Sequence, residues 1–311
     1  MIDLDTFVTW LYVTVDDYCK DAVPMPARPG RDATLSPSEV VTLALLAQWD
    51  RFGSERRFYR EAQRRLRGAF PQLPDRTQYN RLVRQYGPLI GQVALALGRK
   101  VTGWVGYEVL DTVGVRSRDS RRRGSGWLPA EMVNLGRCTR LGWYVGIRVL
   151  TVATAQGVIT GYGLAPASTN DRVLAEEVLA GRRLPALVRV PSAGVSCRQL
   201  YLADGGFWSP RWQAAWRHAY AAQVLAPPQP GTQFYAHWPK WARRRLASRR
   251  QIVETVHDRL LRFFALERDR PHSISGLLAR LAANVGLHNF CLWLNQELGR
   301  PLLAVADLID W

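Results

Sequence analysis

Two short apolar runs that each end in an acidic residue limit the folds open to this chain more than any other feature. Residues 107–113 read Tyr-Glu-Val-Leu-Asp-Thr-Val, and residues 200–207 read Leu-Tyr-Leu-Ala-Asp-Gly-Gly-Phe. Both runs are typical of short buried strands, and the glycine pair after Asp204 predicts an abrupt turn. A carboxylate at the end of a buried strand is costly unless positive charge lies against it. Asp111 and Asp204 are therefore candidate ligands for a cation.

A third acid lies on a predicted helix. Residues 249–264 contain no Gly or Pro, and apolar residues recur there every three or four positions. The adjoining face carries Arg250, Glu254, His257 and Asp258, which are surface neighbours at this spacing. For an arbitrary helix this is a solvated ion-pair stripe, and we keep that interpretation for His257 and Asp258. For Glu254 the two upstream acids favour an oxygen-ligand site for Mg²⁺, and two such ions can drive a phosphodiester displacement.

The composition indicates a polyanionic partner. Lys and Arg number 42 against 26 Asp and Glu, a net charge of +16, and 47% hydrophobic residues are enough for a substantial core. The acidic N-terminus is unlike a signal peptide, and no uninterrupted apolar run reaches the roughly 18 residues of a membrane span. We expect a soluble intracellular protein that makes no use of a membrane.

The first hundred residues are predicted to be helical. Helices are expected over residues 2–20, 37–49, 55–69 and 75–97, and Ser36, Pro37 and Glu39 form a capping-box pattern at the start of the second. The third and fourth helices are basic and joined by a short turn, which suits contacts with DNA base edges. A solvated helical bundle fits this pattern equally well. The candidate DNA contacts here are Arg76, Arg81 and Arg84.

From residue 105 the pattern changes to strands. Residues 141–153 and 158–166 predict a hairpin, and residues 223–226 a further short strand. Asn170 or Asp171 is expected to cap a helix over residues 171–180, and this capping role is why Asp171 is not chosen as a metal ligand.

Two basic stretches in this region are candidate DNA contacts. Aromatic rings that stack on bases, together with arginines, can hold distorted DNA. Trp238 and Trp241 also suit a hydrophobic core, and this is the interpretation that we favour for these two rings. The candidate residues are Arg121, Arg122 and Arg123 in a loop, and Trp241, Arg243, Arg244 and Arg245 ahead of the Glu254 helix.

The order of these elements and acids resembles the DDE transposases of bacterial insertion sequences, in their compact form without a large insertion before the catalytic Glu. The resemblance covers nearly the whole chain. It includes the Leu-Ser-x-Ser-Glu-Val pattern at residues 35–40, Pro-Asp-Arg-Thr at 74–77, Ala-Pro-Ala-x-x-Asn-Asp-Arg at 165–172 and Asp-Gly-Gly-Phe at 204–207. The family's Tyr-x2-Arg-x3-Glu-x6-Lys motif matches Arg250 and Glu254, whereas Ala247 and Leu261 depart from its Tyr and Lys.

The resemblance implies an α/β fold: an RNase H-like mixed five-stranded sheet flanked by helices and preceded by an all-helical DNA-binding region. The expected domains are residues 1–102 for DNA binding and dimerisation, 103–272 for catalysis, and 273–311 as a helical segment packed on the core. Asp111, Asp204 and Glu254 would be the catalytic and metal-binding triad, and Arg250 would bind phosphate.

The resemblance also implies cofactors, partners and a location in the bacterial cytoplasm, on the nucleoid when the protein is bound to DNA. Two Mg²⁺ ions are expected, with Mn²⁺ as a substitute. The expected partners are double-stranded DNA, as terminal inverted repeats and target, and a second copy of the chain in a homodimer. Two alternatives stay open: an RNase H-like nuclease without strand transfer, and an inactive DNA-binding protein that uses only its N-terminal helices.

Overall fold

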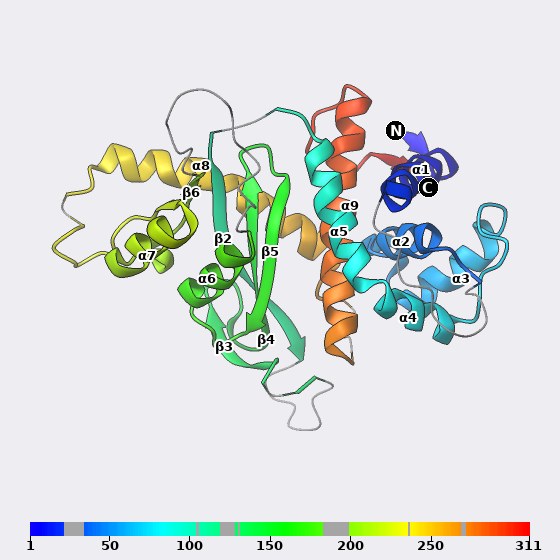
Figure 1. The fold of residues 1–311 in the computed structure, drawn as a ribbon, viewed down its shortest axis with the longest axis horizontal. Coiled ribbons are helices and arrows are strands. Elements are labelled where there is room, and N and C mark those ends of the chain that lie inside the picture. The colour runs from blue at the N-terminus through cyan, green and yellow to red at the C-terminus, as the bar shows by residue number, and fades with distance from the viewer. Residues whose placement is uncertain are drawn as a thin grey trace. The chain divides into compact units, whose positions relative to one another are not determined.

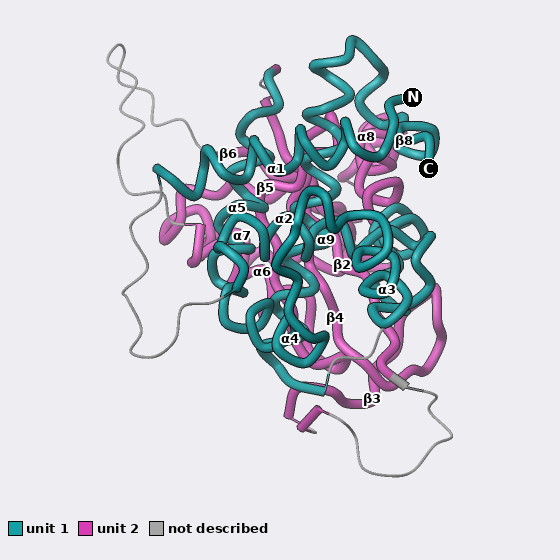
Figure 2. The backbone as a smooth tube through the Cα atoms, turned by 90° about the vertical axis from the view of Figure 1, so that its right-hand side faces the viewer, with its two compact units in different colours: residues 1–102, 258–311 teal, residues 103–257 magenta. Residues whose placement is uncertain are grey.

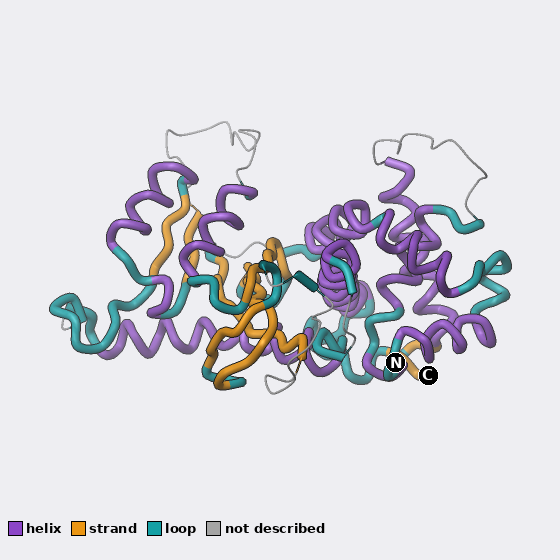
Figure 3. Tube along the Cα trace, turned by 90° about the horizontal axis from the view of Figure 1, so that it is seen from below, coloured by secondary structure: helices purple, strands orange, loops and turns teal. Residues whose placement is uncertain are grey.

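The computed structural model describes residues 1–21, 34–103, 106–118, 128–129, 131–182, 199–235, 237–268 and 272–311. The chain divides into two compact units (Figure 2): unit 1 comprises residues 1–102 and 258–311, and unit 2 residues 103–257. This division groups residues 273–311 with the N-terminal helices, whereas the sequence analysis expected them on the catalytic core. Figure 3 shows that the strands gather in unit 2, while unit 1 is almost wholly helical.

Unit 2 contains a six-stranded mixed sheet. Its order is β3-β4-β2-β6-β7, and β5 shares one edge of β4 with β3. The β3, β4 and β5 strands run antiparallel to their neighbours, whereas β6 and β7 continue parallel to β2. The strands are β2 (Glu108–Arg118), β3 (Asn134–Cys138), β4 (Gly142–Thr154), β5 (Ile159–Pro166), β6 (Gln199–Leu202) and β7 (Ala222–Leu225). The RNase H-like class is confirmed, with β3 added to the five strands expected.

Helices cover both faces of this sheet. One face packs on α6 (Asp171–Gly181) and α7 (Pro210–Tyr220), as Figure 1 shows for α6 over β5. Because side chains alternate along a strand, Leu110 and Leu150 point into this layer, whose core includes the fully buried Trp216. The opposite face carries Asp111 and Thr151, which are paired across β2 and β4, and it meets α8 (Lys240–Asp258).

Unit 1 is built around α9 (Ile274–Glu297), which is buried over most of its circumference and packs chiefly on α5. At Gly286 the helix approaches its neighbours closely, because a Cβ there would lie 3.2 Å from Leu45 Cδ2 and 3.4 Å from Ala94 Cα. Among the described helices α9 alone is long and apolar enough to span a membrane, yet 89% of that window is buried inside the protein. The other helices are α1 (Leu4–Asp21), α2 (Pro37–Leu46), α3 (Glu55–Arg65), α4 (Arg76–Gln85) and α5 (Gly87–Lys100).

Short elements complete the chain. The termini pair as a two-stranded parallel sheet of β1 (Ile2–Asp3) and β8 (Ile309–Asp310). Two 3₁₀ turns, η1 (Asp50–Phe52) and η2 (Gly205–Phe207), and a π-helical turn, η3 (Arg259–Phe263), connect the larger elements.

The capping box predicted for α2 is present: Glu39 N–H donates to Ser36 Oγ, and the Glu39 carboxylate accepts from Ser36 N–H. The single helix expected over residues 75–97 is instead two helices, because the chain turns at Tyr86 before Pro88 of α5.

Candidate active site

Asp111 lies on β2, the central strand, and its carboxylate is mostly withdrawn from solvent. Its side chain is 15% exposed, and the Arg250 guanidinium on α8 binds its Oδ2 at 3.1 Å. Burial raises the pKa of Asp111 to about 7; the Arg250 charge opposes this, and the negative charges of Asp204 and Asp171 add to it. Three acids therefore affect one another electrostatically at this end of the sheet.

Asp204 reaches the same place from the neighbouring strand. Val109 of β2 pairs with Leu202 of β6, so Asp111 and Asp204 each follow a paired residue by two positions. The two strands are parallel where they pair, so Asp111 in the interior of β2 and Asp204 just after β6 lie at the same level of the sheet. The Asp204 side chain accepts a 2.8 Å hydrogen bond from Gly206 N–H and so caps the η2 turn. The sequence analysis paired these two acids, and the strand register brings them together.

Asp171 also belongs to this cluster. Asn170 is the cap of α6, so Asp171 is not needed for capping. Instead its Oδ1 accepts from Thr112 Oγ1 at 2.8 Å and binds the Arg148 guanidinium at 2.6 Å. Its other oxygen, Oδ2, faces the Asp204 turn, since a Cβ on Gly206 would lie 3.1 Å from Asp171 Oδ2 and 2.9 Å from Asp204 Oδ1. The expectation that Asp171 serves only as a helix cap is wrong.

Glu254 is placed differently from the two Asp residues. It is exposed on α8, one helical turn after Arg250, which contacts Asp111. Within the described residues no group of three or more His, Cys, Asp or Glu side chains is arranged to hold a metal ion. Nothing in these contacts joins Glu254 to Asp111 or Asp204, and its place in the triad therefore stays a prediction.

His257 is buried, and its interpretation as a surface residue is wrong. Its Nε2 lies 2.7 Å from Thr151 Oγ1 on β4, and its side chain is hidden between α8 and the sheet. Burial, together with the smaller effects of the Arg140 and Arg250 charges, lowers the pKa of His257 to about 3. The imidazole is therefore neutral and ties α8 to the sheet beside Asp111.

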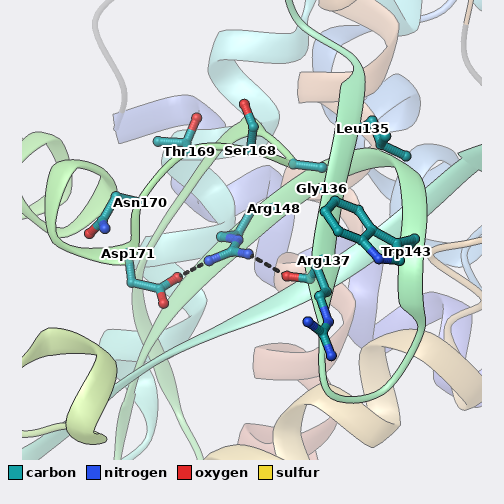
Figure 4. A pocket seen from close by; sticks show the side chains of 10 residues that line it. Leu135, Gly136, Arg137, Trp143, Arg148, Ser168, Thr169, Asn170 and Asp171 are labelled. Atoms are coloured by element: carbon teal, nitrogen blue, oxygen red, sulfur yellow. Dashed lines mark hydrogen bonds and ion pairs between the residues drawn. The ribbon is translucent and has the colours of Figure 1, made fainter. Parts of the chain in front are cut away.

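A pocket of about 350 Å³ opens next to Asp171 (Figure 4). Its floor is Arg148, which donates to Asp171 and to the main-chain carbonyl of Arg137. Gly136 brings β3 against the turn after β5, because a Cβ there would stand 2.3 Å from the Ala167 carbonyl oxygen. Arg137 and Trp143, paired across β3 and β4, are both exposed at its rim. The sequence analysis named Asn170 and Asp171 of this pocket only as helix-cap candidates, and it singled out none of Gly136, Arg137, Trp143 and Arg148.

The candidate DNA-binding residues of unit 2 divide into three groups. The side chain of Trp241 is 67% exposed, so the core interpretation is wrong for this ring, whereas Trp238 is half-buried. Arg243 stacks on the Tyr235 ring, with its guanidinium carbon 4.2 Å from the ring centroid. Both remaining arginines of this stretch, Arg244 and Arg245, are exposed. The three arginines at 121–123 lie outside the described residues.

The donor set suits a hard divalent cation. Asp111 and Asp204 offer carboxylate oxygens only, the ligands that Mg²⁺ and Mn²⁺ prefer. Asp111 carries a carboxylate whose ionisation is disfavoured by burial and by two neighbouring acids, and a cation would relieve that cost. Mg²⁺ needs only one or two protein carboxylates when substrate phosphates and water complete its shell.

An RNase H-like sheet that places acidic side chains at one level of two adjacent parallel strands, within β2 and just after β6, defines the class of phosphodiester-processing enzymes with this fold. A family model described as "Transposase DDE domain" matches residues 120–290, which is more than half of the chain. The chain therefore belongs to the DDE transposase family. The matched range includes Asp204 and Glu254 and begins after Asp111. No curated protein and no solved structure matched the chain.

Proposed function

We propose that this transposase cleaves the ends of an insertion sequence and joins the freed 3'-hydroxyl to target DNA by metal-dependent phosphodiester transfer. The observation that carries the proposal is that Asp111, within β2, and Asp204, just after the adjacent parallel strand β6, lie at the same level of the sheet, with Arg250 bound to Asp111. The proposed triad is Asp111, Asp204 and Glu254. Glu254 is included because the family motif matches it and because α8 already runs past Asp111 one turn earlier.

Asp111 and Asp204 would hold Mg²⁺, or Mn²⁺ in its place, with Glu254 completing the set. When bound, two such ions supply an activated water or 3'-hydroxyl and stabilise the leaving oxygen. The Arg250 guanidinium forms an ion pair with the Asp111 carboxylate in the described structure, and this planar group is equally suited to binding a phosphate oxygen. We assign it to a phosphate beside the scissile bond.

Asp171 would act as a positioning residue. Thr112, which it binds, directly follows Asp111 but points to the other face of β2. The Asp171 carboxylate therefore fixes the strand at the residue beside Asp111 while its second oxygen faces the Asp204 turn. Arg148 orients this carboxylate through a 2.6 Å contact.

DNA is the proposed substrate along the start of α8 and at the arginine-rich loop. Trp241, Arg244 and Arg245 are exposed near the start of α8 and combine a stacking ring with cations, and Arg243 is held beside them by Tyr235. Arg121, Arg122 and Arg123 are assigned to the DNA backbone on charge alone. Because two element ends are joined in one event, we propose a homodimer on DNA, acting in the bacterial cytoplasm.

The test is cleavage and joining by purified variants on a plasmid that carries the coding segment with its flanking DNA. Asp204→Ala is expected to bind this DNA with unchanged affinity and to lose all Mg²⁺-dependent cutting. Glu177→Ala, which removes an exposed acid from α6 in the same unit, is the matched control and should cut normally. Unchanged cutting by Asp204→Ala would refute the proposed site.

Strand-transfer product separates the proposal from a nuclease that cuts without joining. Ala247 and Leu261 stand where the family motif has Tyr and Lys, and both lie within two turns of Glu254. If wild-type protein nicks DNA in Mg²⁺ and forms no joined product, the nuclease alternative holds. If it binds DNA and never nicks, the inactive DNA-binding alternative holds.

A further inference from the structure

Glu108, the first residue of β2, is an acidic residue that the proposed mechanism does not use. It is 5% exposed, and it lies three positions before Asp111 on the same strand. A buried carboxylate is costly unless it is paired with a cation and hydrogen-bonded. A neutral side chain at this position would avoid that cost, so the contacts of the carboxylate indicate what the charge does.

The Glu108 carboxylate is bound by side chains from three other elements of unit 2. Its Oε1 accepts from Thr160 Oγ1 on β5, and it binds the Arg182 guanidinium, just after α6, at 3.0 Å. Its Oε2 accepts from the side-chain amide of Gln199, the first residue of β6. Both carboxylate oxygens are thus used, and the charge is paired. One side chain of β2 therefore holds β5, β6 and the end of α6 together.

The strand β6, which leads to Asp204, is short and is paired only briefly with β2. It has four residues, and its register with β2 is given by two pairs, Glu108 with Tyr201 and Val109 with Leu202. β2 and β4, by contrast, are paired along almost the whole length of β2. Arg182 lies against the first of these pairs, because it binds Glu108 and its guanidinium carbon is 5.6 Å from the Tyr201 ring centroid. The carboxylate and its cation therefore fasten one end of a short ladder.

The register of β6 decides where the Asp204 carboxylate lies. Tyr201 and Ala203 belong to the core layer that α6 and α7 cover. Because side chains alternate along a strand, Leu202 and Asp204 point to the opposite face, which also carries Asp111. A slip of β6 by one residue would turn Asp204 away from that face, and a slip by two would move it about 7 Å along the sheet. Since Mg²⁺ binds oxygens at about 2 Å, either slip would separate the two proposed ligands.

We propose that Glu108 is a positioning residue of the metal site, whose carboxylate sets the register of β6 against β2 and so keeps Asp204 level with Asp111. In this role it acts through Gln199 and Arg182 and touches neither metal nor DNA. A buried ion pair adds little net stability, because desolvation offsets its attraction, and the selection of one register is its best-attested use. The inference rests on the proposed function, since it takes Asp111 and Asp204 as the metal ligands.

The first measurement is amide hydrogen exchange of the full chain in EDTA without DNA, so that neither metal binding nor cutting enters. Glu108→Gln removes the charge at nearly constant shape, and Gln199→Ala removes only the donor on β6. Gln199 is partly exposed, so the second variant tests the link even if loss of the buried charge prevents folding. Leu179→Ala, which removes volume from the same core layer and leaves all three donors to Glu108 in place, is the matched control.

Both link variants should speed exchange in residues 199–204 by roughly 10- to 100-fold relative to residues 144–152 of β4, which corresponds to one lost hydrogen bond to a charged group. Leu179→Ala should speed exchange in the two segments alike, because it lowers stability without breaking the link.

The second measurement is the Mg²⁺ concentration that gives half-maximal cutting, at a temperature where every variant is folded. Glu108→Gln and Gln199→Ala should raise this concentration by roughly 10-fold or more, whereas Leu179→Ala should leave it unchanged. The double substitution Glu108→Gln with Gln199→Glu restores a carboxylate–amide pair between β2 and β6. It should therefore recover much of the loss, which a role in stability alone does not predict.

Two outcomes would overturn the inference: equal acceleration of exchange in both segments for the two link variants, or an unchanged Mg²⁺ requirement in both. The second outcome would show that Glu108 serves stability alone. If the wild-type chain does not cut DNA in Mg²⁺, the proposed function fails, and the exchange of residues 199–204 alone decides whether Glu108 sets the register. The two proposals therefore fail separately.

Discussion

Acidification should destabilise the protein through His257, and the size of the effect follows from its surroundings. The imidazole is buried against Thr151, and its pKa is lowered from 6.5 to about 3, chiefly by burial and then by Arg140 and Arg250. Between these pH values the imidazole is protonated in the unfolded chain but not in the folded chain. The contribution of His257 to the free energy of unfolding is therefore fully present above pH 6.5 and is lost as the pH decreases towards 3. The loss is about 2 kcal/mol at pH 5 and about 4 kcal/mol at pH 3.

The perturbation is His257→Gln, which keeps a side-chain amide within reach of Thr151 and removes the titration. The free energy of unfolding is measured in urea with EDTA at pH 7 and pH 5 for both proteins. Asp111, whose raised pKa makes the protein more stable as the pH falls, acts in both proteins and cancels in the difference. Wild type should lose about 2 kcal/mol more than His257→Gln between these pH values.

Proton NMR of the five histidines gives an independent measurement, with the His257 signal identified by its absence from the variant. A His257 signal that titrates near pH 6.5, or an identical pH dependence of stability in both proteins, would refute the buried neutral imidazole. The consequence would be that α8 is not held to the sheet at this point.

Two further predictions concern the pocket and the acid cluster. Gly136→Ala should destabilise the protein by about 2 kcal/mol or more in urea unfolding, because the added Cβ would overlap the Ala167 carbonyl. Gly181→Ala, at the end of α6 with open space around it, should be neutral or slightly stabilising. Equal effects of the two substitutions would contradict the close approach of Gly136 to Ala167. Asp171→Asn should reduce Mg²⁺-dependent cutting at least 10-fold and raise the Mg²⁺ concentration needed for half-maximal thermal stabilisation, because the neutral amide loses the ion pair with Arg148 that orients the side chain. An unchanged metal requirement would show that Asp171 serves packing alone.

Local patterns in the sequence were enough for several elements. The capping box at Ser36 and Glu39 marks the start of α2 correctly, because both hydrogen bonds form between residues three positions apart. The strands that carry Asp111 and precede Asp204 were also predicted correctly, because buried strands leave short apolar runs. The turn that separates α4 from α5 was missed, although Gly87 and Pro88 were available as signals.

What the sequence did not predict depends on contacts distant along the chain. Asp171 has a helix-capping pattern, yet its partners are Thr112, 59 residues earlier, and Arg148 on β4. His257 has charged neighbours in sequence and is nevertheless turned towards Thr151, 106 residues away. No local pattern carries such information.

The same reason explains two differences in the fold. The added strand β3 contains Gly136 and Arg137 in a mixed polar run and exists because it pairs with the first part of β4. The α9 helix follows the catalytic region in sequence but packs on α5, and this association could not be read from its apolar pattern alone.

The most direct test of the central claim is the anomalous diffraction of manganese in crystals of the protein bound to cleavable DNA. We predict manganese in contact with the carboxylates of Asp111, Asp204 and Glu254, and Arg250 moved from Asp111 to a DNA phosphate. Manganese bound elsewhere, with Arg250 still paired to Asp111 and Glu254 turned to solvent, would contradict the account.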